Sequence, residues 1–134
     1  MIKLEIVVPD GLVFSGEVDE VTLPGAGGYL GILPQHAPLL SELCVGILSY
    51  RVDSDVTKLF CRSGFVEVLA DKVTVLAEAA ERVDQVDADQ AREDKEQAER
   101  VLTANDPDTD YDETMLLLEQ AEARLQLLEP STHL

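Results

Sequence analysis

Apolar and polar residues alternate along the chain from residue 1 to about residue 81. At the start, Ile2, Leu4, Ile6 and Val8 are separated by single residues, two of which carry charge. An alternation with period two is typical of a β-strand that buries one of its faces. Similar short runs recur after turn residues, and no segment of helix length separates them. The pattern predicts roughly eight short strands in an antiparallel β-sandwich rather than βαβ units.

Residues 23–40 interrupt this pattern with repeated glycine and proline, in the sequence LPGAGGYLGILPQHAPLL. Glycine permits positive φ and close backbone approach, whereas proline fixes φ and removes an N–H donor. A helix is therefore excluded here. We expect a short strand over residues 28–33 that opens into a rigid turn, in which Pro34 and Pro38 frame a lone histidine, His36.

The apolar spacing lengthens to three and four residues beyond residue 86, which predicts helices. The expected stripes are Ala88, Ala91, Ala98 and Leu102, then Leu118, Ala121, Leu125 and Leu128. Asp87 is placed to cap the first helix, residues 104–108 end it, and Pro130 ends the second. We expect an antiparallel two-helix hairpin that also packs on something else, because neither helix is sufficiently buried by the other. The predicted protein is α+β, with a β-sandwich over residues 1–84 and a helical hairpin over residues 85–134.

The chain is strongly acidic, with 27 Asp and Glu against 10 Lys and Arg. Nucleic acid is excluded as a partner, since phosphate binding needs clustered cations, and attachment to anionic lipid is equally disfavoured. Residues 87–134 carry 14 acidic and 4 basic side chains, whereas residues 1–86 carry 13 and 6. The hairpin is therefore the more acidic part per residue.

Membrane insertion is not expected from the sequence. There is no signal peptide and no apolar run of about 18 residues, and the run from Leu116 to Leu118 is interpreted as core. We expect a cytoplasmic protein that reaches a membrane only through partners. Cys44 and Cys61 lie in apolar, strand-like runs and are predicted to be buried free thiols rather than a disulfide. No cysteine or histidine spacing indicates a metal site.

Candidate catalytic chemistry is sparse. His36 has no serine or cysteine nucleophile in a recognisable motif, His133 lies in the terminal tail, and the glycines form neither a P-loop nor a G-x-G-x-x-G motif. For His36 we favour a structural role in its turn over contact with a partner. These residues favour a structural or interaction protein without a cofactor. Two alternatives remain, a free-standing binding module with a coiled-coil-like tail and a small hydrolase that uses His36.

Four motifs, taken in order, resemble the epsilon subunit of bacterial F-type ATP synthases, and the resemblance spans nearly the whole chain. They are FSG at 14–16, the stretch at 23–40, SGFVEV at 63–68, and KVTVLA followed by AER within 72–82. The resemblance implies a rotor subunit, itself not an enzyme, that binds the gamma subunit and rests on the membrane ring of c subunits. Ion flow through that ring would drive ATP synthesis in the head. The implied location is peripheral, on the cytoplasmic face of the plasma membrane.

The same resemblance assigns roles to particular residues. Gly28, Tyr29, Leu30 and Gly31 match the turn that faces the c ring, and His36 matches a position near gamma. Some members carry an acidic residue where this chain has Tyr29, so an aromatic packing contact would replace a charged one.

The hairpin resembles a regulatory element that either folds against the sandwich or extends into the alpha/beta head and blocks ATP hydrolysis. Some members bind ATP through an I/L-D-x-x-R-A motif, which leaves Asp87 and Arg92 as weak candidates because Gln90 replaces the arginine. Loss of that cation predicts poor ATP binding. Since the hairpin is acidic and the head segment that it would approach is acidic in the family, we expect the compact pose to dominate.

Overall fold

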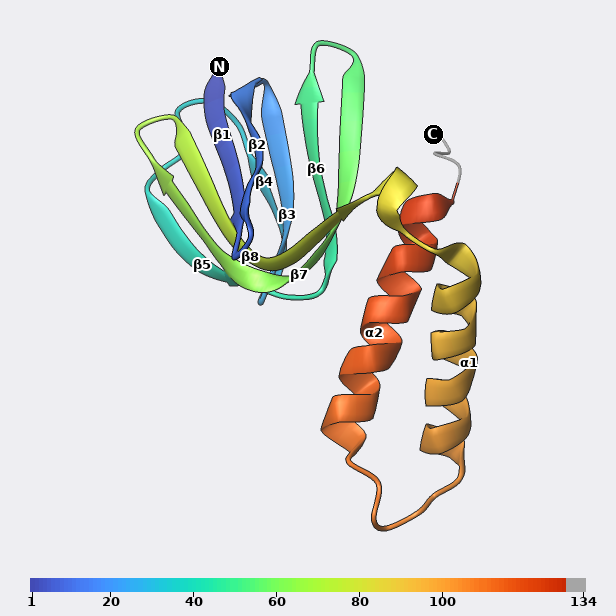
Figure 1. The fold of residues 1–134 in the computed structure, drawn as a ribbon. Coiled ribbons are helices and arrows are strands. Elements are labelled where there is room, and N and C mark those ends of the chain that lie inside the picture. Colours follow the sequence, from blue (N-terminus) through green and yellow to red (C-terminus); the bar gives the residue numbers. More distant parts are fainter. Residues whose placement is uncertain (130–134) are drawn as a thin grey trace.

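The computed structural model describes residues 1–129 and contains eight strands followed by two helices (Figure 1). The strands are β1 (Ile2–Val8), β2 (Gly11–Val18), β3 (Glu20–Gly25), β4 (Gly28–Ile32), β5 (Leu39–Leu43), β6 (Gly46–Val52), β7 (Asp55–Leu69) and β8 (Lys72–Arg82). A 3₁₀ turn, η1 (Val83–Gln85), leads to α1 (Ala88–Thr103) and α2 (Tyr111–Leu128). The predicted sandwich and helical hairpin are confirmed. Pro130 and His133, named from the sequence, lie outside the described residues.

The strands follow the order β2-β1-β8-β7-β5-β3-β4, and β6 pairs with both β3 and β7. All pairs are antiparallel except β1 and β8, which run parallel with Leu4 opposite Val73. The expectation of purely antiparallel pairing is therefore wrong at this pair. The first strand, β1, thus occupies an interior position of the sheet, between its hairpin partner β2 and the last strand, β8.

β7 bends sharply and carries the sheet from one layer of the sandwich to the other (Figure 1). Its first part pairs with β6 and its second part with β5, and both parts pair with β8. The bend lies at Ser63 and Gly64, where φ is 53° and 137°. A Cβ on Gly64 would lie 2.0 Å from the Leu76 carbonyl oxygen, so only glycine fits. The SG pair that opens the SGFVEV motif is therefore the point at which β7 changes layer.

The inward side chains of both layers form one core. Its fully buried members include Ile2, Leu4 and Ile6 of β1, at the positions that the alternation predicts. Cys61 is buried on β7 and its thiol is free, as expected. Cys44 is also free, but the prediction that it is buried is wrong. It follows the last residue of β5, where the chain turns toward β6 and the side chain faces solvent.

The hairpin begins where the sequence predicts. The Asp87 side chain accepts a hydrogen bond from the Gln90 N–H at the start of α1, and Asp110 accepts one from Glu113 at the start of α2. The seam between the helices buries small side chains, Ala91 and Ala98 from α1 and Ala121 from α2.

The two helices project past one end of the sandwich (Figure 1). Leu116 and Leu117 lie on the projecting part of α2 and are 43% and 52% exposed, so their assignment to the core is wrong. Neither helix of the described residues is long and apolar enough to cross a membrane.

Candidate functional site

The β3–β4 turn presents three of the four residues predicted to face the c ring. Strand pairing continues to Gly25 opposite Gly28, so only Ala26 and Gly27 connect the strands. Gly28 has φ of 127°, and a Cβ on Gly25 would lie 2.7 Å from the Gly28 carbonyl oxygen. Both positions therefore need glycine. Gly28, Tyr29 and Gly31 are exposed, whereas Leu30 turns inward and packs against the sandwich core.

Tyr29 is exposed and yet anchored. Its side chain is 58% exposed, while its hydroxyl accepts a hydrogen bond from the backbone N–H of Ile47 at 3.1 Å. Gly46 lies directly against the hydroxyl end of this side chain, since a Cβ there would lie 2.7 Å from the Tyr29 hydroxyl and from Pro24. The ring thus lies over the start of β6 with one face open to solvent.

The structure places His36 at the opposite end of the sandwich from Tyr29. The 33–38 connection follows β4, and it is fixed there by a 2.6 Å hydrogen bond from the Gln35 N–H to Asp71 Oδ1 in the β7–β8 turn. The His36 N–H donates to the Leu33 carbonyl, and its Nδ1 donates to the Ala37 carbonyl at 2.7 Å. The imidazole therefore braces its own turn. One continuous motif in the sequence supplies two separate surfaces in the fold.

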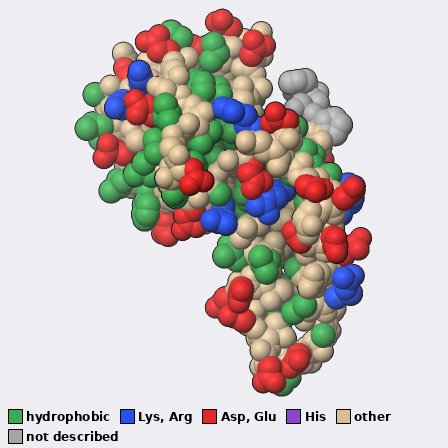
Figure 2. Space-filling view, in the orientation of Figure 1, with side chains coloured by type: hydrophobic (Ala, Val, Ile, Leu, Met, Phe, Trp, Pro, Cys, Tyr) green, Lys and Arg blue, Asp and Glu red, His purple; other side chains and the backbone are tan. Residues whose placement is uncertain are grey.

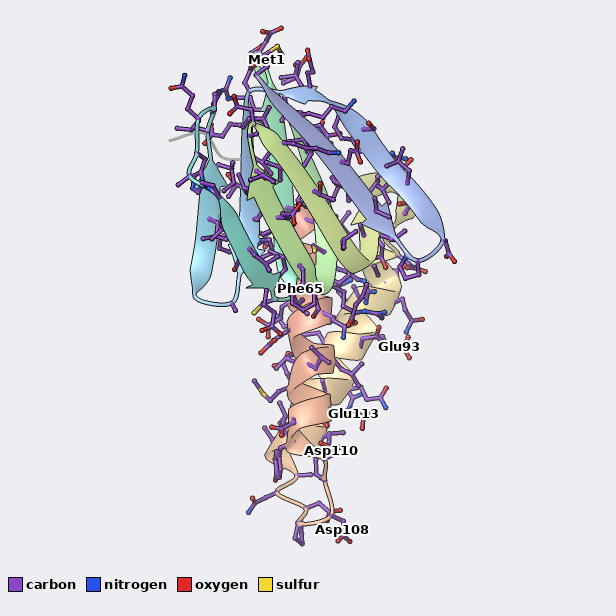
Figure 3. The ribbon with its side chains drawn as sticks, turned by 90° about the vertical axis from the view of Figure 1, so that its left-hand side faces the viewer. Met1, Phe65, Glu93, Asp108, Asp110 and Glu113 are labelled. Atoms are coloured by element: carbon purple, nitrogen blue, oxygen red, sulfur yellow. The ribbon has the colours of Figure 1, made fainter. Side chains whose placement is uncertain are left out.

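A third surface, which the sequence interpretation missed, is an apolar face on the outside of β5, β7, β8, β1 and β2. Figure 3 shows this face toward the viewer, with Phe65 at its lower end. Strand register places Phe65, Leu76, Val7 and Leu12 side by side in one row across four strands. Phe65 and Leu76 are each 54% exposed. We call this row, together with Leu40 and Leu69, which lie on the same side of the sheet beside and beyond Glu67, the outer apolar face.

Side chains of the outer apolar face border a shallow groove of about 300 Å³ beside Phe65 and Pro9. Apolar side chains also gather along this flank of the sandwich in the space-filling view, whereas acidic side chains are scattered over the hairpin (Figure 2). The signal in the sequence was present. Phe65-Val66 and Val75-Leu76 put apolar residues on both faces of a strand, a pattern typical of strands covered on both sides.

The hairpin rests on the sandwich through one face of α2. Ala123 and Leu127 pack with the buried ring of Phe60, against which Val45, Ile47 and Val86 also lie. Arg124 donates two hydrogen bonds to Glu81 of β8, each 2.9 Å, and its guanidinium lies 4.5 Å from the centre of the Phe60 ring. We call Val45, Ile47, Phe60 and Val86 the seat of the hairpin. The expectation that the hairpin needs a second surface is confirmed.

Asp87 and Arg92, the two candidate ATP-binding residues, make contacts within α1 itself. Asp87 caps α1 and Arg92 forms an ion pair with Asp89, while the Gln90 side chain donates to Asp94 at 2.8 Å. Arg92 borders an open groove of about 590 Å³ between the helices, whose other lining side chains are Ala88, Lys95, Glu96, Glu99, Leu125, Leu128 and Glu129. Three carboxylates against two cations oppose a triphosphate.

Reactive groups are few among residues 1–129. No set of three or more His, Cys, Asp or Glu side chains is arranged to hold a metal ion in this part of the chain. Burial raises the pKa of the Cys61 thiol to about 11, so it stays protonated and unreactive at neutral pH. The surfaces described above offer binding rather than chemistry.

Two family models together match all of the described residues, 1–129. The model described as ATP synthase, Delta/Epsilon chain, beta-sandwich domain matches residues 1–83, and the model described as its long alpha-helix domain matches residues 84–129. An ATP synthase epsilon chain from Koribacter versatilis is 47% identical over 106 residues, which cover 79% of this chain and 75% of that relative. Another, from Nitratidesulfovibrio vulgaris strain DP4, is 43% identical over 126 residues, which cover 94% of both chains.

Two solved structures share the fold. A chain of the Euglena gracilis mitochondrial ATP synthase, in the OSCP/F1/c-ring structure, aligns with a TM-score of 0.85 and 21% identity over 96% of this chain and 81% of that one. A chain of the Tetrahymena thermophila mitochondrial ATP synthase central stalk and c-ring aligns with a TM-score of 0.60 and 16% identity, over 95% and 92%. At these identities the likeness shows the fold alone.

Proposed function

Because this chain belongs to the epsilon-chain family of ATP synthase, we propose that it turns with the central stalk and couples ion flow through the c ring to ATP synthesis. Epsilon chains are non-catalytic subunits, so the chain acts through its contacts. The proposal includes a peripheral position on the cytoplasmic face of the plasma membrane, and a division of labour between a rotor-binding part, residues 1–84, and a regulatory part, residues 85–134.

The outer apolar face carries the proposal. A chain with a net charge of −17 has little reason to leave Phe65 and Leu76 half exposed beside Val7 and Leu12 unless a partner covers them. We assign this face to the gamma subunit. Its central members are large apolar side chains on rigid strands, which is the arrangement found at the centre of stable interfaces.

The test is binding of gamma by full-length chain carrying Phe65→Glu. Burial of a phenylalanine side chain contributes about 1.5–3 kcal/mol, so the substitution should weaken binding at least about tenfold. Val56→Glu is the matched control, because Val56 lies on the same strand, is 51% exposed and is outside the outer apolar face. Equal binding by wild type and Phe65→Glu would reject this assignment.

The β3–β4 turn is assigned to the c ring, through Gly28, Tyr29 and Gly31, with Leu30 holding the turn on the core. The exposed ring of Tyr29 supports an aromatic packing contact in place of a charged one. Tyr29→Asp should weaken coupling of ATP synthesis to ion flow in membrane vesicles while the sandwich stays folded. Unchanged coupling would reject the contact.

His36 is assigned to a position near gamma, separate from the ring contact. The opposite ends of the sandwich that carry Tyr29 and His36 support two partners rather than one. Because His36 already braces its turn, we expect it to act by shaping the 33–38 connection against gamma.

The hairpin is proposed to regulate ATP hydrolysis by the alpha/beta head. Among residues 1–129, its docking on the sandwich rests on a small seat and on the Arg124–Glu81 ion pair, which supports a hairpin that can leave as a unit. Its acidic surface supports weak inhibition in the extended pose, because like charges oppose docking on an acidic segment.

A further inference from the structure

Three hydrogen bonds fasten the end of β5 and the start of β6 to the β3–β4 hairpin. Two join backbone atoms, from the Ala26 N–H to the Glu42 carbonyl at 3.0 Å and from the Cys44 N–H to the Pro24 carbonyl at 2.8 Å. The third comes from the Ile47 N–H to the Tyr29 hydroxyl. It is therefore the one of the three that depends on an exposed side chain.

The segment held by these bonds also forms part of the seat. Val45 and Ile47 pack with Phe60 beneath Ala123 and Leu127 of α2, and Ile47 lies directly opposite Phe60 in the strand register. The side chain of Ile47, whose N–H binds Tyr29, thus packs against the cluster of Phe60, Ala123 and Leu127. One residue, Ile47, joins the β3–β4 turn to the surface on which the hairpin docks.

We propose that Tyr29 couples the β3–β4 turn to the hairpin: a partner that draws the Tyr29 ring away from Ile47 loosens the seat and raises the undocked fraction of the hairpin. Conversely, a docked hairpin holds Ile47 in place and favours the inward position of Tyr29, because coupling between two sites is reciprocal. The proposal rests on the proposed function only for the identity of that partner, the c ring.

The geometry suits a modest effect rather than an all-or-none one. Only the hydroxyl of Tyr29 is hydrogen-bonded and one face of its ring is open to solvent, so rotation of the ring breaks one hydrogen bond and removes only its contact with the start of β6. Water can replace the Tyr29 hydroxyl as the partner of the Ile47 N–H. The change in docking free energy is therefore no larger than the net contribution of an ordinary hydrogen bond. We expect the ratio of undocked to docked hairpin to rise by up to about fivefold.

The experiment uses full-length chain in solution and reads the methyl resonances of Ala123 and Val86 by NMR. Ala123 packs with Phe60 and Leu127, and Val86 packs against these three side chains. The variant Tyr29→Phe removes only the hydroxyl. Tyr50→Phe makes the same chemical change on β6, where the Tyr50 ring stacks on Phe14 instead. A double variant, Arg124→Gln with Leu127→Asp, supplies the resonances of the undocked hairpin.

We expect Tyr29→Phe, and not Tyr50→Phe, to move the Ala123 and Val86 methyls toward the undocked reference. In the reverse direction, the undocked reference should exchange its Ile47 N–H with solvent up to about fivefold faster than wild type, although Tyr29 is intact. The coupling would be overturned if Tyr29→Phe changed the Ile47 resonances and left the methyl resonances of Ala123 and Val86 unmoved. It would also be overturned if the Ile47 N–H exchanged at the wild-type rate in the undocked reference. Neither measurement involves gamma or the c ring, so both can be interpreted even if the proposed function is wrong.

Discussion

Arg124 of α2 holds Glu81 of β8 with two parallel hydrogen bonds of 2.9 Å, and both side chains are less than a third exposed. A guanidinium fork on a carboxylate is both directional and strong for an ion pair. The pair joins the last strand of the sandwich to the last helix of the hairpin, so it bears directly on whether the two stay together.

Arg124→Gln should loosen the hairpin without unfolding the sandwich. Loss of a half-buried, charge-assisted pair and of the contact with Phe60 should cost about 1–3 kcal/mol of docking free energy. Hydrogen exchange of the β6 amides next to the seat should accelerate, while exchange in β1 stays slow. Arg100→Gln is the control, since Arg100 is an exposed residue of α1. Equal exchange in both variants would contradict the role of the pair.

Gly64→Ala should destabilise the sandwich by more than about 2 kcal/mol. Positive φ at a non-glycine residue is strained, and the new Cβ would collide with the backbone at Leu76. Urea unfolding followed by circular dichroism measures the loss. Gly27→Ala is the matched control, because a Cβ there meets nothing within 4 Å. A Gly64→Ala chain as stable as Gly27→Ala would show that β7 need not bend at this residue.

Cys61 should make stability fall with rising pH between about pH 9 and pH 11. Its pKa is raised from 9.0 to about 11 by burial, so above pH 9 the unfolded chain loses a proton that the folded chain keeps. The unfolded state therefore gains stability over this window, by about 2–3 kcal/mol in total. Urea unfolding at several pH values should show this slope in wild type and a shallower one in Cys61→Ala. Parallel slopes would contradict it.

The two thiols should also differ in reactivity toward an aromatic disulfide reagent at pH 8. Cys44 is exposed and should react within the mixing period, whereas Cys61 should react only as the protein unfolds. Denaturant should make the Cys61 thiol accessible to the reagent. Rapid reaction of two thiols in the native protein would place Cys61 at the surface.

ATP should bind the isolated chain more weakly than the low micromolar range. Gln90 cannot supply the cation of the family motif, and Arg92 is already paired with Asp89. Gln90→Arg should improve affinity at least about tenfold, since a charge-assisted contact contributes about 1.5–3 kcal/mol. Calorimetry decides this, with Gln97→Arg as the control of equal charge on the same helix. Low micromolar binding by wild type would refute the reasoning.

Inhibition of ATP hydrolysis by the hairpin should be weak at low salt and, if anything, stronger as salt rises. Salt screens the repulsion between the acidic hairpin and an acidic segment of the head. The measurement compares hydrolysis by the assembled head with the full-length chain and with a chain that ends at Val86, across a salt series. A many-fold release by truncation at low salt, fading as salt rises, would mean that attraction governs docking.

Local rules were sufficient for the elements of the fold. Alternation predicts the side chains of Ile2, Leu4 and Ile6 in the core, and the capping side chain of Asp87 predicts the start of α1, as the structure has them. These features depend on neighbouring residues, so the sequence alone contains them.

Features that depend on distant residues were not accessible in the same way. The order of the strands sets both the parallel pairing of β1 with β8 and the separation of Tyr29 from His36. Local periodicity does not predict that order. Leu116 and Leu117 follow helical spacing, yet the sandwich ends before it can cover them. The outer apolar face is not predicted for another reason: Phe65-Val66 and Val75-Leu76 are adjacent apolar pairs, and such pairs do not follow the alternation that tells an inner face from an outer one.

The parallel pairing of β1 with β8 also sets the order in which a ribosome can complete this protein. Leu4 pairs with Val73, which lies 69 residues later in the sequence and is synthesised roughly 3–14 s after it at ordinary rates. Until then β1 has only β2, and an isolated two-stranded hairpin is barely stable in water. The β1–β8 pairing therefore forms late, and Ile2, Leu4 and Ile6 stay accessible to chaperones until it does. The hairpin, which is synthesised last, meets a finished surface.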